Sequence, residues 1–328
     1  MSLLEIKNLK TYFYTPFGAV KAVDGISFVL NKGRSLGLAG ESGCGKTTVA
    51  LSIMRILPYP GRTIDGEIFF NDENILTLND SQLREFRWKI ISIVFQGAMA
   101  SLNPLFKIGN QIAEPIIIHE KIKKKEAMKR AEDLLEMVGI DSSRAGNYPW
   151  ELSGGMRQRV MIAMALACEP EMVIADEPNT ALDVIVADQI MELIKKLREK
   201  LDLSMLLITH DLSMIAQTCD EVAIMYAGKI VEKTDTPTIF SSPLHPYTHA
   251  LVKSFPNIKG PRKHLKGIYG HPPDLINPPS GCRFNPRCGY AEDICRRENP
   301  ELNKISKNHF LACHLIDKIL AKGHNNGN

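Results

Sequence analysis

At 328 residues, the chain is long for one domain and suits a main domain followed by an extension. Its 44% hydrophobic and 23% charged residues are typical of a globular protein with a sizeable core. The net charge of +3, from 40 Lys and Arg against 37 Asp and Glu, argues against nucleic acid or an anionic membrane as the main partner.

The chain has no segment that predicts membrane crossing or export. Its longest uninterrupted apolar stretch, residues 160–168, is much shorter than the roughly 20 apolar residues that a spanning helix needs. The first residues lack the basic region, apolar run and cleavage site of a signal peptide. We therefore expect the protein to remain in the reducing cytosol.

Residues 1 to about 240 alternate short apolar runs with helical patterns, which predicts an α/β domain with a largely parallel sheet. Between residues 108 and 168 the strand signal gives way to helical periodicity, which indicates a helical subdomain at about 105–168. We expect strands at 36–39, 90–95, 172–175, 205–208 and 222–225, and helices at 46–57 and 184–200.

Residues 40–47, Gly-Glu-Ser-Gly-Cys-Gly-Lys-Thr, fit the phosphate-loop pattern and lie between a predicted strand and a predicted helix. Lys46 would reach the β- and γ-phosphates of a nucleoside triphosphate, and the Thr47 hydroxyl would bind magnesium. Cys44 is interpreted as a small residue between glycines, with a redox-sensitive thiol as the alternative. The nucleotide-binding residues predicted here are Gly40, Glu41, Ser42, Gly43, Cys44, Gly45, Lys46, Thr47 and Thr48.

Two carboxylates end the predicted strand at 172–175. An acidic residue at the end of a buried strand, opposite a phosphate loop, serves to hold magnesium, which predicts that role for Asp176. Glu177, the next residue, could polarise the attacking water as a general base.

Residues 152–159, Leu-Ser-Gly-Gly-Met-Arg-Gln-Arg, predict a second helix N-terminus that could bind an anion, with Ser153 as its N-cap. Here the chain resembles the ABC ATPase family, whose signature motif is Leu-Ser-Gly-Gly-Gln. The resemblance implies that Ser153, Gly154 and Gly155 serve ATP held by a partner subunit, while Met156 departs from the usual Gln. It also implies a P-loop NTPase core with an antiparallel β subdomain and the inserted helical subdomain.

The same resemblance, which covers residues 3 to about 235, assigns the remaining motifs. Gln96 is similar to the Q-loop glutamine that contacts magnesium and the attacking water, and His210 to the switch histidine at the γ-phosphate. Asp183 ends a stretch similar to the D-loop. Phe13, with Tyr14 beside it, best matches the aromatic that stacks on adenine.

Ten prolines between residues 243 and 300 predict a C-terminal extension, 241–328, with little regular structure after an ATPase domain at 1–240. Within it, residues 242–251 (SPLHPYTHAL), 270–275 (GHPPDL) and 279–288 (PSGCRFNPRC) resemble the C-terminal extension of ATPases in the dipeptide, oligopeptide and nickel importers. The stretch 96–104 also resembles part of these ATPases, with Gly97 and Ala98 in place of the usual Asp-Pro.

The resemblance implies an ATP-hydrolysing subunit on the cytoplasmic face of the membrane that energises import of dipeptides or oligopeptides. It implies a second homologous ATPase as heterodimer partner, two membrane-spanning permeases and an extracellular peptide-binding protein, and no nucleic acid. A nickel or other small-solute importer is the alternative, followed by a non-transport ABC ATPase with a redox-sensing cluster.

Four cysteines gather in the extension, with five, six and seventeen residues between Cys282, Cys288, Cys295 and Cys313. A proline-rich segment in the cytosol has no core to bury free thiols, so a metal is expected to cross-link it. Zinc sites favour close Cys-x-x-Cys pairs, which this segment lacks, whereas iron–sulfur clusters accept wider spacings. The spacing favours a 4Fe–4S cluster, with zinc as the alternative.

Overall fold

The computed structural model describes residues 1–97, 101–180, 182–254 and 267–323. The contacts within the chain divide it into two units. The first consists of Met1, Leu30–Ser35 and Asn74–Ile208, and the second consists of Ser2–Val29, Leu36–Glu73 and Thr209–Asn328.

The first unit is built on three parallel strands in the order β8-β7-β6. These are β6 (Ile91–Val94), β7 (Met172–Asp176) and β8 (Ser204–Thr209). Every residue of β7 and β8 is buried, which explains why both appear in the sequence as nearly continuous apolar runs. The helices of this unit are α2 (Asp80–Lys89), α4 (Ile108–Glu120), α5 (Lys124–Met137), α6 (Gly154–Ala165) and α7 (Val184–Leu201), with 3-10 turns at Ile75–Thr77, Ser142–Gly146 and Pro149–Glu151.

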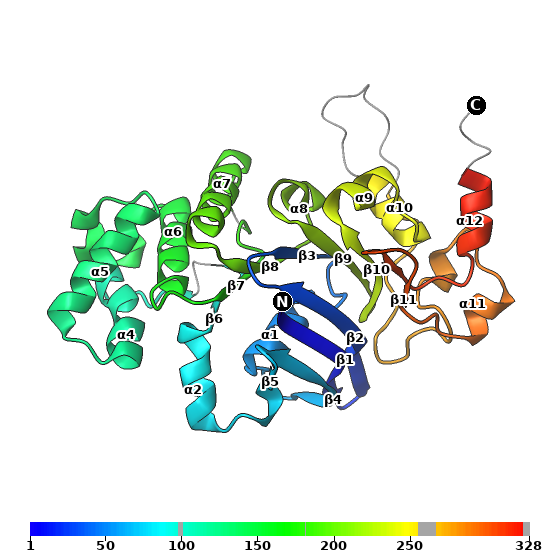
Figure 1. Ribbon diagram of the computed structural model, residues 1–328, viewed down its shortest axis with the longest axis horizontal. Helices are drawn as coiled ribbons and strands as arrows, with labels where there is room; N and C mark the ends of the chain where they lie inside the picture. Colours follow the sequence, from blue (N-terminus) through cyan, green and yellow to red (C-terminus); the bar gives the residue numbers. More distant parts are fainter. Residues whose placement is uncertain (98–100, 181, 255–266, 324–328) are drawn as a thin grey trace. The chain divides into compact units, whose positions relative to one another are not determined.

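Helices α4, α5 and α6 pack against one another and form a helical layer within the first unit (Figure 1). Buried alanines at positions 127 and 131 on α5, spaced one turn apart, allow close approach. No strand is present among the described residues between 108 and 168, so the predicted helical stretch is confirmed.

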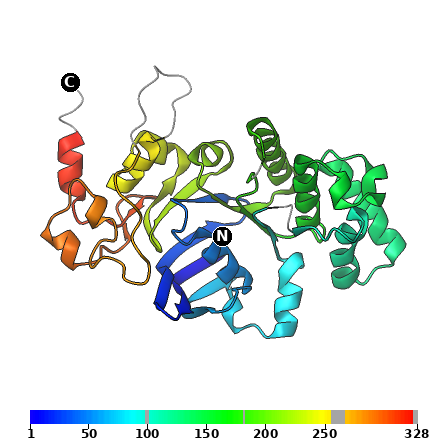
Figure 2. The ribbon, with the colours of Figure 1, turned by 180° about the vertical axis from the view of Figure 1, so that it is seen from behind.

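The second unit contains a sheet in the order β2-β1-β4-β5, in which β1 and β4 are antiparallel (Figures 1 and 2). Helix α1 (Lys46–Met54) packs against β1. The strands are β1 (Ser2–Thr15), β2 (Gly18–Asn31), β4 (Gly61–Phe70) and β5 (Glu73–Asn74).

A second set of strands in this unit runs in the order β11-β12-β10-β9-β3. Strand β3 (Ser35–Ala39) is parallel to β9 (Glu221–Tyr226), which forms an antiparallel hairpin with β10 (Lys229–Asp235). The C-terminal extension joins this sheet through β12 (Phe310–Leu311), which pairs with β10, and β11 (Asn303–Lys304), which pairs with β12. The helices are α8 (Leu212–Thr218), α9 (Thr236–Ser241), α10 (Pro246–Lys253), α11 (Asp293–Arg297) and α12 (Ile316–Gly323), with a 3-10 turn at Asn285–Arg287.

Two expectations need correction. The helix predicted at 46–57 ends at Met54, because Arg55 adopts a left-handed conformation (φ 51°). The extension is more regular than its prolines suggest, since α10 lies within it. Pro246 occupies the first turn of that helix, where a missing N–H costs nothing, and His245 caps it through Nδ1.

Candidate nucleotide site

The loop at residues 40–47 connects β3 to α1, as the motif predicted. Two of its glycines have no room for a side chain. A Cβ at Gly40 would lie 2.1 Å from the Met225 carbonyl oxygen, and one at Gly45 would lie 2.0 Å from the Ala22 carbonyl oxygen. Gly45 also has φ +108°, which side chains disfavour. The loop is therefore held tightly between β2 and β9.

Lys46 lies within the loop, 6% exposed, and its ammonium donates to the carbonyl oxygens of Gly40 (2.8 Å) and Glu41 (3.0 Å). Helix α1 begins here without a side-chain cap and without an acidic residue in its first turn. An N-terminus of this kind offers backbone N–H groups and partial positive charge to an anion.

Cys44 is buried in the same loop, with Sγ 3.7 Å from the Lys46 ammonium. Burial raises the pKa of the Cys44 thiol, and the nearby ammonium only partly opposes this. A buried neutral thiol is a poor nucleophile. The packing interpretation of Cys44 is thus favoured over the redox one.

In the first unit, β7 ends at Asp176, which is 2% exposed, and Glu177 follows it. Glu177 has φ 45°, an uncommon conformation for a residue with a side chain, and its N–H donates to Ile208 O on β8 (2.8 Å). Gln96 Nε2 and Thr180 Oγ1 both donate to Glu177 Oε2, at 2.9 and 3.0 Å. The structure thus brings Gln96 and Glu177 together, and it adds Thr180, which the sequence analysis missed although it lies within the D-loop stretch.

The signature segment begins α6, and Ser153 caps it by accepting from the Met156 N–H (3.3 Å). Gly155 lies against α7, where a Cβ would be 2.6 Å from Val186 Cγ1. Asp183 caps α7 by accepting from the Val186 N–H (2.9 Å). Ala98, which replaces the usual Pro in the stretch 96–104, lies outside the described residues, and so does Ala181 of the D-loop stretch.

His210 follows β8 directly and is exposed. The next residue, Asp211, caps α8 by accepting from the Ser213 N–H (2.8 Å). This turn therefore presents the imidazole at the carboxyl end of a buried strand.

Three aromatic side chains near the N-terminus differ in exposure. Phe13 is partly buried and packs on β4, since a Cβ at Gly61 would be 2.7 Å from its ring. Tyr14 is 48% exposed, and Phe17, at the turn between β1 and β2, is 87% exposed. Phe17 precedes the strand that contacts the loop at Ala22, and the sequence analysis did not single it out.

All four clustered cysteines, Cys282, Cys288, Cys295 and Cys313, line one pocket in the extension. Burial raises the pKa of Cys282 to about 11 and also raises the pKa of Cys288 and Cys313. Among the described residues, no three His, Cys, Asp or Glu side chains are placed to hold a metal ion. The metal-binding extension is therefore not borne out and stays a prediction.

Within the described ranges, no helix combines the length and apolar character that crossing a membrane requires. The model of the ABC transporter family matches residues 23–180. A second model, the C-terminal region of oligopeptide/dipeptide transporters, matches residues 231–295.

Known proteins resemble the chain over most of its length. A probable peptide ABC transporter ATP-binding protein of Sinorhizobium fredii is 45% identical and aligns over 97% of this chain and 96% of its own. An oligopeptide transport ATP-binding protein of Bacillus subtilis is 46% identical over 96% of this chain and 89% of its own. A solved dimeric ATP-binding cassette, bound to ADP and phosphate, has a TM-score of 0.65 and 27% identity, and covers 71% of this chain and 99% of its own.

Proposed function

The chain belongs to the ATP-binding proteins of ABC transporters, and from this membership we infer that it hydrolyses ATP to drive import of oligopeptides or dipeptides. The observation that supports peptide as the transported cargo is the family match of the C-terminal extension. Residues 231–295 match the C-terminal region of oligopeptide/dipeptide transporters, and full-length relatives with the same region are named for peptide transport.

The phosphate loop would bind the triphosphate through its backbone N–H groups, with Lys46 neutralising the β- and γ-phosphates. Thr47, Asp176 and Gln96 would supply oxygen ligands, the type that magnesium prefers, so the chemistry of this donor set fits the ion. Magnesium, when bound, offsets the charge of the phosphates during transfer.

Glu177 would act as the general base toward the attacking water. Its Oε2 accepts from Gln96 and Thr180, and these two hydrogen bonds fix the direction of the carboxylate. The Q-loop glutamine that Gln96 resembles also senses the membrane subunits in the ABC ATPase family, so this contact would connect that signal with the base. His210 would contact the γ-phosphate.

Ser153, Gly154 and Gly155 would complete the ATP site of a partner subunit, so this chain would carry only part of each composite site. The relevant solved cassette is a dimer. We propose a heterodimer with a second ATPase, joined to two permeases and supplied by an extracellular peptide-binding protein, at the cytoplasmic face of the membrane. Domain boundaries at 1–240 and 241–328 belong to the same proposal.

Uptake by vesicles that contain the assembled transporter tests the proposal. Labelled di- or oligopeptide should accumulate in the compartment that holds this subunit, and only when that compartment also contains ATP. Lys46→Ala should abolish this accumulation. Peptide uptake that needs no ATP, or that survives Lys46→Ala, would refute it. Uptake of nickel with no uptake of peptide would support the alternative cargo.

We also propose that Cys282, Cys288, Cys295 and Cys313 hold a 4Fe–4S cluster, with zinc as the alternative. The shared pocket supports a common ligand, and burial raises the pKa of the Cys282, Cys288 and Cys313 thiols within it. The preference for a cluster over zinc rests on the spacing of the four cysteines, because zinc sites favour close Cys-x-x-Cys pairs and iron–sulfur clusters accept wider spacings.

Anaerobic purification followed by an absorption spectrum and metal analysis tests the cluster. We expect a broad band near 400 nm and about four iron atoms per chain, both lost in Cys288→Ser. One zinc atom and no band would refute the cluster and leave the nucleotide site unaffected.

A further inference from the structure

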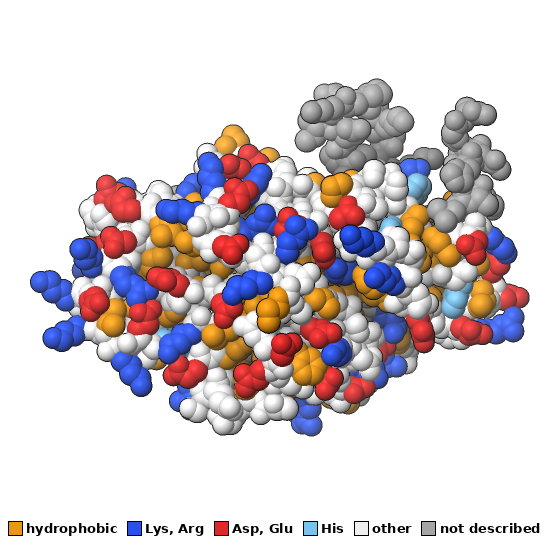
Figure 3. Space-filling view, viewed as in Figure 1, with side chains coloured by type: hydrophobic (Ala, Val, Ile, Leu, Met, Phe, Trp, Pro, Cys, Tyr) orange, Lys and Arg blue, Asp and Glu red, His pale blue; other side chains and the backbone are white. Residues whose placement is uncertain are grey.

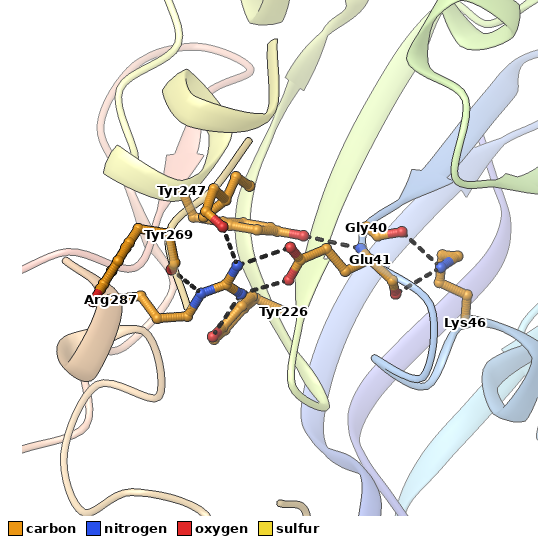
Figure 4. Close-up of polar contacts among 8 residues, drawn as sticks. Gly40, Glu41, Lys46, Tyr226, Tyr247, Tyr269 and Arg287 are labelled. Atoms are coloured by element: carbon orange, nitrogen blue, oxygen red, sulfur yellow. Dashed lines mark hydrogen bonds and ion pairs between the residues drawn. The ribbon is translucent and has the colours of Figure 1, made fainter. Parts of the chain in front are cut away.

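A residue of the extension forms an ion pair with the phosphate loop. Arg287 Nη1 and Nη2 donate to the two carboxylate oxygens of Glu41, at 2.6 and 3.0 Å (Figure 4). The two residues are 246 positions apart in the chain, and the side chain of Arg287 is only 5% exposed. A two-point pair of this kind fixes orientation as well as charge.

The guanidinium of Arg287 makes as many hydrogen bonds as it has N–H donors. Nε donates to Tyr269 O (2.9 Å), Nη1 also donates to Tyr226 Oη (3.3 Å), and Nη2 also donates to Ile268 O (3.3 Å). With the two bonds to Glu41, these five contacts equal the five N–H donors of an arginine. An arginine guanidinium stays protonated in proteins, so the pair with Glu41 is an ion pair. A buried guanidinium with all of its donors satisfied differs from an ordinary ion pair on the protein surface, which contributes little to stability.

The extension also holds the backbone of Glu41. Its N–H donates to Tyr247 Oη at 2.9 Å, and its carbonyl accepts from the Lys46 ammonium at 3.0 Å (Figure 4). Tyr247 is fully buried and packs on Tyr226, with ring centroids 4.6 Å apart. The backbone of Glu41 is therefore held by the extension through its N–H and by Lys46 through its carbonyl.

Glu41 places a negative charge in a loop that must accept a polyphosphate. Arg287 offsets that charge, and without it the carboxylate would repel the nucleotide. At about 10 Å and an effective dielectric constant of about 20, such a repulsion weakens binding by on the order of tenfold.

We propose that Arg287 is a positioning residue of the ATP site, which holds and neutralises Glu41 so that the extension sets the affinity of the phosphate loop for nucleotide. The proposal rests on the proposed role of residues 40–47 in binding ATP. It gives the extension a function at the nucleotide that is independent of which metal the cysteines hold.

Titration of the full-length protein with magnesium and AMP-PNP tests this. Arg287→Gln should weaken binding about tenfold, and the defect should shrink at high ionic strength because salt screens the exposed carboxylate. Adding Glu41→Gln to Arg287→Gln should restore affinity to within about threefold of the unmodified protein, since it removes the repelling charge. In ATPase assays of the complex, KM for ATP should rise more than kcat falls.

Arg283→Gln is the matched control, because Arg283 anchors the same segment but pairs with Asp24 and the Ala227 carbonyl, outside the loop. It should change the affinity less than about twofold. Unchanged affinity in Arg287→Gln, an equal loss in Arg283→Gln, or no recovery in the double variant would overturn the proposal. If Arg287→Gln does not fold, Arg287→Lys replaces it in the test. Lysine loses the two-point pair but keeps the charge that offsets Glu41, so its affinity for AMP-PNP should fall less than about threefold, and a tenfold loss would overturn the proposal. Failure of the unmodified protein to bind AMP-PNP would instead refute the nucleotide site itself.

Discussion

Glu177 combines an uncommon backbone conformation with a carboxylate fixed by two hydrogen bonds. Its φ of 45° directs the residue away from the course of β7, and the N–H bond to Ile208 O holds that turn. A residue kept in a sparsely populated conformation at the end of a buried strand is typical of a functional position. The geometry is consistent with the role of general base proposed from its place after Asp176.

Replacing this carboxylate tests the role. Glu177→Gln should still bind ATP and should release phosphate at least ~100-fold more slowly, since a positioned base contributes about that factor. The amide oxygen of Gln can still accept from Gln96 and Thr180, so folding should not change. Phosphate release measured at saturating ATP checks this, and near-normal turnover would place the base elsewhere.

The adenine-stacking aromatic is the residue whose assignment the structure makes most testable. The family resemblance favours Phe13, with Tyr14 beside it, but Phe13 packs on β4 while Phe17 is almost fully exposed. A base-stacking side chain must have an open face before the nucleotide binds.

We expect Phe17→Ala to weaken AMP-PNP binding about tenfold, because stacking on a base contributes about 1–3 kcal/mol. Phe13→Ala should instead lower the free energy of unfolding, since its ring is packed, and should leave affinity largely unchanged. Titrations of both variants compare the two residues directly. The reverse pattern would support the original assignment of Phe13.

At the scale of elements, sequence pattern was most successful where burial is complete. Strands β3, β7, β8 and β9 were placed to within a residue or two, because both faces of each are covered and the apolar run is continuous. Helix α10 was missed, because ten prolines obscured a favourable first-turn proline and a histidine cap.

The candidate site likewise contains residues that the sequence predicts and contacts that it does not. Loop and strand-end residues such as Lys46, Asp176 and Gln96 follow from local motifs. The pair between Arg287 and Glu41 does not, because no periodicity or spacing relates residues 246 positions apart. Contacts of this kind are determined by tertiary packing alone.

The extension is joined to β10 by a buried carboxylate. Glu232, 0% exposed, accepts from the N–H groups of Leu244 and His245 at 2.9 Å each and contacts His309 Nε2 at 2.7 Å. Burial would raise its pKa, but the hydrogen bonds from His309 and the two N–H groups more than offset this, and the pKa is lowered. The ionised form is therefore the one that stabilises the fold.

Glu232→Gln should lower the free energy of unfolding by about 3 kcal/mol at pH 7, since it removes one partner of a buried charged cluster. A lowered folded-state pKa gives stability that is present above the unfolded value near 4.3 and lost below it as the pH falls through the folded value. The difference in the free energy of unfolding between the unmodified protein and Glu232→Gln should therefore stay constant above about pH 5 and diminish at lower pH.

Urea unfolding followed by circular dichroism at several pH values checks this. Glu292→Gln, which removes an exposed pair with Lys318, is the control and should cost less than about 1 kcal/mol. A Glu232→Gln protein as stable as the unmodified one at pH 7, or a difference that persists unchanged to pH 3, would show that the carboxylate does not hold the extension.

At the scale of the whole molecule, charge gives little indication of partners. Lys and Arg side chains are interspersed with Asp and Glu on the face shown in Figure 3, in keeping with a net charge of +3. Recognition must then depend on shape and on specific motifs. Under the proposed function, the chain would contribute a phosphate loop and a base to one ATP site and a signature helix to another, and its extension would support the loop through Arg287.

The most direct test of the central claim is whether peptide controls ATP hydrolysis in the complete transporter. In proteoliposomes that contain both ATPases, the permeases and the binding protein, peptide should raise the rate of phosphate release several-fold, and Lys46→Ala in this subunit should remove the stimulated part. Hydrolysis that is indifferent to di- and oligopeptides, or that responds to nickel alone, would contradict the account.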